Sequence, residues 1–192
     1  MLESPSLSDS DLLRLLSGGD QSAFLEFYRR HQAVVYRFAL HMSGRVEIAE
    51  EVTQDVFMVV MRVAKQYDAK RGSVIGYVYG IARNVVMRAL ERERLYGTSL
   101  DDTAIDSASR VAAEQDLLAE LAHYERIQML RSAVLALPPA YREAVVLCDL
   151  HEMDYSDAAG VVGCPIGTIR SRLHRARALL LEKMRAAERC AV

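Results

Sequence analysis

The side chains with the clearest chemical purpose lie near the C-terminal end, in the run YSDAAGVVGCPIGTIRSRLHRARALL that begins at Tyr155. Ile169, Leu173 and Ala176 recur every three or four residues, so the basic and hydroxyl groups between them fall on the opposite side of a helix. Arginine can donate two hydrogen bonds to a guanine edge, and hydroxyls and helix N-terminal amides can hold phosphates. The outward residues that we expect to contact DNA are Thr168, Arg170, Ser171, Arg172, His174 and Arg175.

The elements around this run have the layout of a helix-turn-helix. Ser156 can cap a short helix that closes at Gly163, a turn with Pro165 follows, and a last helix runs from about Ile166 nearly to the C-terminus. An arginine-rich helix face taken alone is usually only solvated. The short helix and the tight turn in front of it favour DNA binding instead.

Residue patterns typical of catalysis or metal binding do not occur in the sequence. Glu-x-x-His is found once, at Glu120 and His123, whereas a di-iron bundle needs two such pairs. His151-Glu152 lacks the second histidine of a zinc-protease helix, and three widely spaced cysteines form no metal pair or disulfide framework. We therefore expect a protein without an active site, a metal or a cofactor.

The composition describes a chain whose binding sites must be local. The net charge is −2 and the pI is near 6.2, which excludes coating of nucleic acid by bulk positive charge. The N-terminus has no apolar signal core, and no uncharged apolar stretch approaches the about 18 residues needed to cross a bilayer. We expect a cytoplasmic protein with no membrane contact of its own.

Helical periodicity predicts an all-α fold of two small helical domains joined by a linker, with residues 1–96, 97–122 and 123–192 as the three parts. The linker is small, polar and acidic, and becomes helical near its end. In the first domain we expect helices capped by Asp9 or Ser10, by Asp20 and by Ser73, and one from Val46 to about Lys65. In the second we expect helices from at or before Tyr124, from Tyr141 to about Leu150, and in the helix-turn-helix.

The helix from Val46 carries polar side chains on the face opposite to its valines. An acidic stripe of this kind is by itself more typical of a solvated surface than of a binding site. The stripe includes Glu50, Glu51, Gln54 and Asp55.

Four stretches of the chain resemble the extracytoplasmic-function sigma factors of bacterial RNA polymerase. PIGTIRSRLHRAR is similar to the recognition helix of their fourth domain, and LPPAYREAVVL, residues 137–147, to the helix that opens that domain. IAEEVTQDVF, residues 48–57, resembles their polymerase-binding helix, and KRGSVIGYVYGIARN, residues 70–84, the loop and helix that read the minus-10 element. The resemblance implies a non-enzymatic subunit that directs promoter-specific initiation by RNA polymerase.

The resemblance also implies a role for each surface. The acidic stripe would dock on the clamp helices of the large subunit of core RNA polymerase, and the last helix would read the minus-35 duplex of promoter DNA. Capture of an unstacked minus-10 strand needs phosphate contacts, base-edge hydrogen bonds and an aromatic wall. The residues implied are Lys70, Arg71, Ser73, Tyr77, Arg83 and Asn84.

Several details stay open at this point. Either Tyr77 or Tyr79 could stack on a base, and one of them must face the core; many family members carry tryptophan where Tyr77 stands. An anti-sigma factor is a further partner that the resemblance implies. The alternative is a dimeric helix-turn-helix regulator whose N-terminal domain senses a ligand, although no ligand pocket is evident in that part of the sequence.

Overall fold

The first domain consists of four helices whose ends follow from local residue chemistry. The computed structural model describes residues 7–96 and 117–190, without the side chains of residues 96, 117–122, 187, 188 and 190. The helices are α1 (Asp9–Ser17), α2 (Gln21–Ser43), α3 (Val46–Val63) and α4 (Val74–Tyr96), and two short 3-10 turns at 64–66 and 69–71 link α3 to α4.

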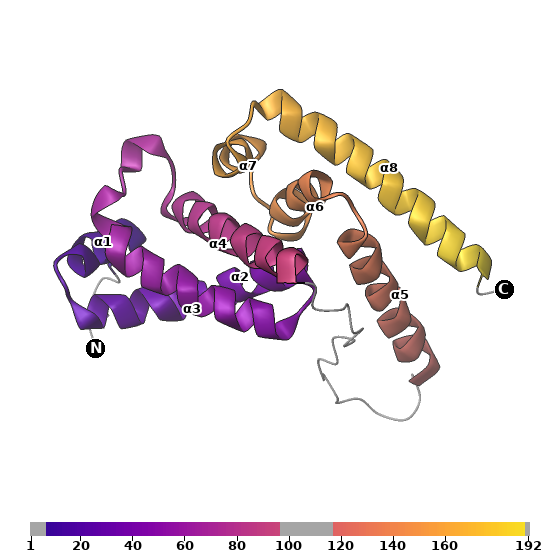
Figure 1. The fold of residues 1–192 in the computed structure, drawn as a ribbon, viewed down its shortest axis with the longest axis horizontal. Coiled ribbons are helices and arrows are strands. Elements are labelled where there is room, and N and C mark those ends of the chain that lie inside the picture. The colour runs from indigo at the N-terminus through magenta and orange to yellow at the C-terminus, as the bar shows by residue number, and fades with distance from the viewer. Residues whose placement is uncertain (1–6, 97–116, 191–192) are drawn as a thin grey trace, which may run out of the picture.

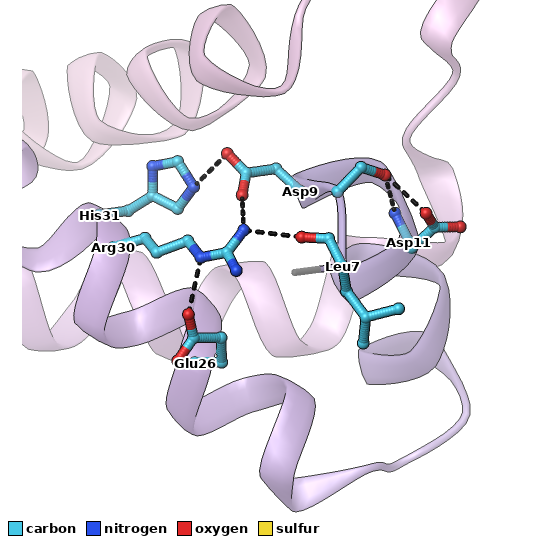
Figure 2. A network of polar contacts seen from close by, with 7 residues as sticks. Leu7, Asp9, Asp11, Glu26, Arg30 and His31 are labelled. Carbon is cyan, nitrogen blue, oxygen red and sulfur yellow. Dashed lines mark hydrogen bonds and ion pairs between the residues drawn. The ribbon is translucent and has the colours of Figure 1, made fainter. Parts of the chain in front are cut away.

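Of the helix caps expected in this domain, Asp20 for α2 and Ser73 for α4 are confirmed, and the cap expected for α1 is wrong. The Asp20 carboxylate accepts a hydrogen bond from the Ala23 amide at 2.9 Å, and α2 ends at Gly44 in the left-handed conformation. The cap of α1 is Ser8, not Asp9 or Ser10. The Asp9 carboxylate is instead engaged by α2, where Arg30 lies at 2.9 Å and His31 at 3.0 Å, so it is not available to the helix end (Figure 2).

The second domain contains α5 (Leu117–Leu135), α6 (Pro139–Val145), a π-helical segment (Val146–Leu150), α7 (Tyr155–Val162) and α8 (Ile166–Cys190). α6 begins at Pro139, two residues before the expected Tyr141, because proline suits the first helical position, where no amide bond is lost. Ser156 is not the cap of α7: it lies inside the helix, and Asp154 precedes it without a side-chain cap bond. No strand occurs among the described residues, so the all-α prediction is confirmed.

Apolar side chains fill each domain and continue from one domain into the other. Phe27, Phe38 and Val56 are buried in the first domain, and Leu147 and Leu173 in the second. Figure 1 shows the helices of the first domain on one side and α6, α7 and α8 on the other, with α7 beside α4. α2 also packs against α5 and against the π-helical segment. The described part of the chain therefore shows the two domains in direct contact.

Candidate nucleic-acid interface

The helix-turn-helix is formed by α7, the turn at 163–165 and α8. Gly163 has a φ of 74°, and its amide and that of Cys164 both donate to the Ala159 carbonyl, at 2.8 and 3.0 Å. This left-handed residue closes α7 and turns the chain into α8. Ile169 and Leu173 are fully buried, as the spacing predicts. Their burial fixes which face of α8 points away from the protein.

The outward face of α8 is positively charged and open. Arg170, Ser171, His174 and Arg175 are exposed, whereas Thr168 and Arg172 are half-buried. None of the ion pairs that the described residues form includes an arginine of this face. Arg177, farther along, differs because its guanidinium binds the Asp149 carboxylate at 2.6 and 3.1 Å. The first three turns of α8 thus present cations that are available to a polyanion.

A second group of polar residues surrounds a cavity between the two domains. The cavity has a volume of about 420 Å³ and is lined by the loop at 66–73, by α4 and by α7. Arg71, Ser73, Tyr77 and Asn84 line it, while Lys70 is exposed on the same loop. The Ser73 hydroxyl accepts a hydrogen bond from the Gly76 amide at 3.1 Å, which confirms Ser73 as the cap of α4. The same hydroxyl donates a hydrogen bond to the Asp157 carboxylate of α7 at 3.2 Å. Five of the six predicted minus-10 residues thus lie in or beside one loop and cavity.

The two tyrosines of α4 have different surroundings. Tyr79 is 4% exposed, and its burial raises the pKa of its hydroxyl to about 12, so it is the tyrosine that faces the interior. Tyr77 is half-buried at the cavity, and its hydroxyl donates to the Val63 carbonyl at 2.8 Å. Its ring centroid lies 5.4 Å from that of Tyr67, which also lines the cavity. Tyr67 is a candidate that the sequence reasoning did not name, although it lies only three residues before the stretch at 70–84 that resembles the minus-10 reader.

Arg83, the sixth predicted minus-10 residue, lies apart from the cavity. Its guanidinium forms an ion pair with Glu143 of α6, whose side chain is only 5% exposed. In this arrangement the cation is neutralised by the second domain of the same chain. A contact between Arg83 and a phosphate would therefore require the ion pair to break.

The polar stripe of α3 is a surface feature, as the periodicity predicts. Glu50, Glu51, Gln54 and Asp55 are all exposed, and Val52 and Val56 between them are buried. Glu51 is bound by Arg92 of α4 at 2.5 Å. Two large apolar side chains, Met58 and Met61, are exposed farther along the same helix. The face therefore combines negative charge with accessible apolar surface, which is a composition suited to a protein partner.

No group of three or more histidine, cysteine, aspartate or glutamate side chains in residues 7–96 and 117–190 is arranged to hold a metal ion. Among the helices of the same ranges, none combines the length and the apolar character needed to cross a membrane.

Known families match both domains. Residues 27–96 match the family described as Sigma-70 region 2, and residues 127–180 match the family described as Sigma-70, region 4. Together the two matches define the class, a transcription initiation factor of the sigma-70 type. One relative places the chain in a subgroup of this class. The ECF RNA polymerase sigma factor SigM of Mycobacterium tuberculosis is 30% identical over 175 residues, which are 90% of this chain and 83% of SigM. This chain belongs to the extracytoplasmic-function (ECF) RNA polymerase sigma factors.

Further relatives agree with this assignment. The ECF RNA polymerase sigma factor SigE of Mycolicibacterium smegmatis is 34% identical over 163 residues, which are 83% of this chain but 62% of SigE. Among solved structures, the sigma factor RpoE in complex with the anti-sigma factor NepR from Bartonella quintana has a TM-score of 0.67 at 25% identity, over 84% of this chain and 96% of that one. CnrH in complex with the cytosolic domain of CnrY shares the fold, with a TM-score of 0.67, 23% identity, and coverage of 93% of this chain and 97% of that one.

Proposed function

We propose that this sigma factor contacts core polymerase and promoter DNA through three separate surfaces. The exposed stripe of α3 docks on the clamp helices of the large polymerase subunit. The first three turns of α8 read the minus-35 element as duplex, and the loop at 67–73 with the first half of α4 holds the unstacked minus-10 strand. The polymerase performs the chemistry, and the protein acts in the cytoplasm without an active site of its own.

The observation that carries the proposal is the open cationic face of α8. Arg170 and Arg175 are exposed near the N-terminal end of a helix whose opposite face is packed in the core. Such a helix can enter a major groove without any change in its own packing. The acidic stripe on α3 carries charge of the opposite sign, so the two surfaces suit different partners.

The cavity supports the minus-10 assignment through the types of its lining groups. Tyr67 and Tyr77 offer aromatic rings, Ser73 and Asn84 offer hydrogen-bonding groups, and Arg71 offers a cation. An unstacked base needs these three kinds of partner. Because Tyr79 is buried, Tyr77 is the tyrosine of α4 that we assign to this site.

An anti-sigma factor is the further partner that we propose. The RpoE structure that this chain resembles contains such a protein, NepR. A ligand-sensing dimeric regulator is disfavoured because residues 27–96 match Sigma-70 region 2.

Run-off transcription with bacterial core polymerase on a promoter library tests the proposal. Transcripts from one sequence class that appear only when this protein is added are the expected result. Variants with Arg170→Ala and with Asn84→Ala then separate the two DNA contacts, because the first should alter upstream preference and the second downstream preference. Tight binding of duplex by the protein alone, without polymerase-dependent transcripts, would contradict the proposal.

A further inference from the structure

Three aromatic side chains with ionisable groups meet where the two domains touch. His151, which follows the π-helical segment of the second domain, lies between His41 of α2 and Tyr79 of α4. Its Nδ1 is 2.6 Å from the Tyr79 hydroxyl, and its Nε2 is 3.3 Å from Nδ1 of His41. The ring of Phe38 packs edge-on against His151, with 5.9 Å between centroids. Both ring nitrogens of His151 are thus used to join it to the first domain.

Two neutral arrangements of protons satisfy both contacts. In one, the Tyr79 hydroxyl donates to Nδ1 of His151 and the Nε2–H of His151 donates to Nδ1 of His41; in the other, both hydrogen bonds run in the opposite direction. If both imidazoles were protonated, two N–H groups would face each other across the 3.3 Å contact. The chain of hydrogen bonds therefore depends on at least one imidazole being neutral.

The surroundings oppose a positive charge at this place. Burial, the neighbouring His41 and Arg37 lower the pKa of His151 to about 4, and burial together with Arg131 and Arg37 lowers the pKa of His41. Neither histidine belongs to an ion pair with a carboxylate of the described residues. The ionisable groups on the packed elements are Arg37 on α2, Tyr79 on α4, Arg131 on α5, and Asp149 and Glu152 beside His151 itself.

The same domain contact covers residues that we assign to promoter DNA. Glu143 of α6 holds Arg83, and Asp157 of α7 accepts the Ser73 hydroxyl. In both cases a carboxylate of the second domain binds a side chain to which we assign a contact with nucleic acid. A chain closed in this way cannot offer Arg83 to DNA.

We propose that His41, His151 and Tyr79 form an acid-sensitive clasp that holds the two domains closed, and that protonation of its histidines opens the domains and releases Ser73 and Arg83. The clasp goes beyond the proposed function, and its benefit to DNA binding rests on that function.

The direction of the pH dependence follows from linkage. In the open form we expect the histidines to return toward their ordinary pKa of 6.5. Because the pKa is lower in the closed form, closure is fully favoured above 6.5 and weakens as the pH falls toward the value in the closed form. At about pH 5.5, release of His151 alone shifts the ratio of open to closed protein by about tenfold.

Small-angle X-ray scattering of the full chain at about pH 7.5 and about pH 5.5 tests the clasp. The proteins compared are the native chain, Glu143→Gln, and each of them with His151→Gln added. Glu143→Gln removes the cross-domain ion pair and so brings the equilibrium between open and closed forms into the measurable range. The substitution also removes an interface carboxylate that could itself titrate. Circular dichroism at both pH values checks that the helices persist. Exposed His123→Gln on α5 is the matched control.

Expansion at the lower pH with unchanged helix content is the expected result in the Glu143→Gln protein, with a rise of about tenfold in the ratio of open to closed forms. His151→Gln should remove most of that response, whereas His123→Gln should leave it intact. Equal dimensions of Glu143→Gln at the two pH values, or equal expansion with His151→Gln present, would overturn the clasp. Scattering reports domain separation whether or not the released residues bind DNA, so a failure of the clasp is distinguishable from a failure of the proposed promoter contacts.

Discussion

Arg83 of α4 and Glu143 of α6 form an ion pair across the boundary between the two domains, with side chains that are 25% and 5% exposed. Glu143 also lies among buried apolar neighbours on α6, Ala144 and Val145. A carboxylate buried to this degree is retained at low energy only when a cation accompanies it. The pair therefore fixes the orientation of α6 toward α4 and occupies a residue that we assign to the minus-10 strand.

Glu143→Gln is predicted to increase the affinity for single-stranded minus-10 oligonucleotides by about three- to tenfold, equivalent to about 1 kcal/mol. The substitution keeps the size of the side chain and removes the charge that holds Arg83. Fluorescence anisotropy with a labelled oligonucleotide measures the change. Glu125→Gln, an exposed position on α5, is the control and should change nothing. Unaltered affinity in Glu143→Gln would show that Arg83 makes no contact with the strand.

Asp55→Arg is predicted to weaken binding to core polymerase by about tenfold or more, because a reversed charge on an exposed stripe repels the cations that the stripe should meet. Asp55 is exposed and its neighbour Val56 is buried, so the fold should be unaffected. Binding of labelled protein to core enzyme, followed as a function of salt, measures the effect. Glu125→Arg provides the same charge change away from the stripe. A loss of similar size in both variants would indicate a general charge effect instead of a docking face.

The helix-turn-helix, its turn and the polar stripe could all be predicted from sequence, because each depends on spacing within one helix. The left-handed Gly163, the buried Ile169 and the exposed Asp55 are local consequences of periodicity and of backbone sterics. The partners of Arg83 and His151 could not be predicted, since Glu143 lies 60 residues away from Arg83 in sequence and joins it only when the domains pack. The cap at Ser8 could not be predicted for a related reason. The carboxylate of Asp9, one of the two expected caps, forms an ion pair with Arg30 on the next helix instead.

Arg170→Ala is predicted to cost about 1–3 kcal/mol in holoenzyme binding to a promoter and to relax the preference at one upstream position. This is the signature of a bidentate contact with a base edge. Binding to a set of duplexes that differ at single minus-35 positions measures it. Arg189→Ala, at an exposed position near the end of the same helix, should leave the preference unchanged. A uniform loss over all duplexes would make Arg170 a phosphate contact.

Two glycines of the helix-turn-helix are predicted to respond to alanine with opposite signs. Gly163 has a φ of 74°, which alanine adopts only with strain, so Gly163→Ala should lower the free energy of unfolding by about 1 kcal/mol. Gly160 lies within α7, and an added Cβ would meet no atom within 4 Å. Gly160→Ala should therefore raise the free energy of unfolding by up to about 1 kcal/mol. Urea denaturation of both variants checks the signs, and stabilisation by Gly163→Ala would contradict the account of the turn.

Asp9→Asn is predicted to weaken the attachment of α1 to α2 and to make the protein more sensitive to acid. Burial lowers the pKa of His31 below 6.5, and the Asp9 carboxylate, 3.0 Å from its Nε2, partly opposes that shift. Without the carboxylate the pKa should fall further. Because the imidazole titrates at lower pH in the folded than in the unfolded protein, stability is lost as the pH falls below 6.5, and more steeply in the variant.

NMR titration of the His31 imidazole, together with urea unfolding at about pH 7.5 and about pH 5.5, measures the two consequences of Asp9→Asn. Arg30 also loses a carboxylate partner at 2.9 Å, so the variant should be less stable even at the higher pH. Asp11→Asn is the matched control, since Asp11 lies on the same helix but contacts Ser8 and Arg14 instead. It should leave the titration of His31 unchanged. An unchanged titration in Asp9→Asn would mean that the contact between Asp9 and His31 does not persist in solution, and α1 would then be held by its buried leucines alone.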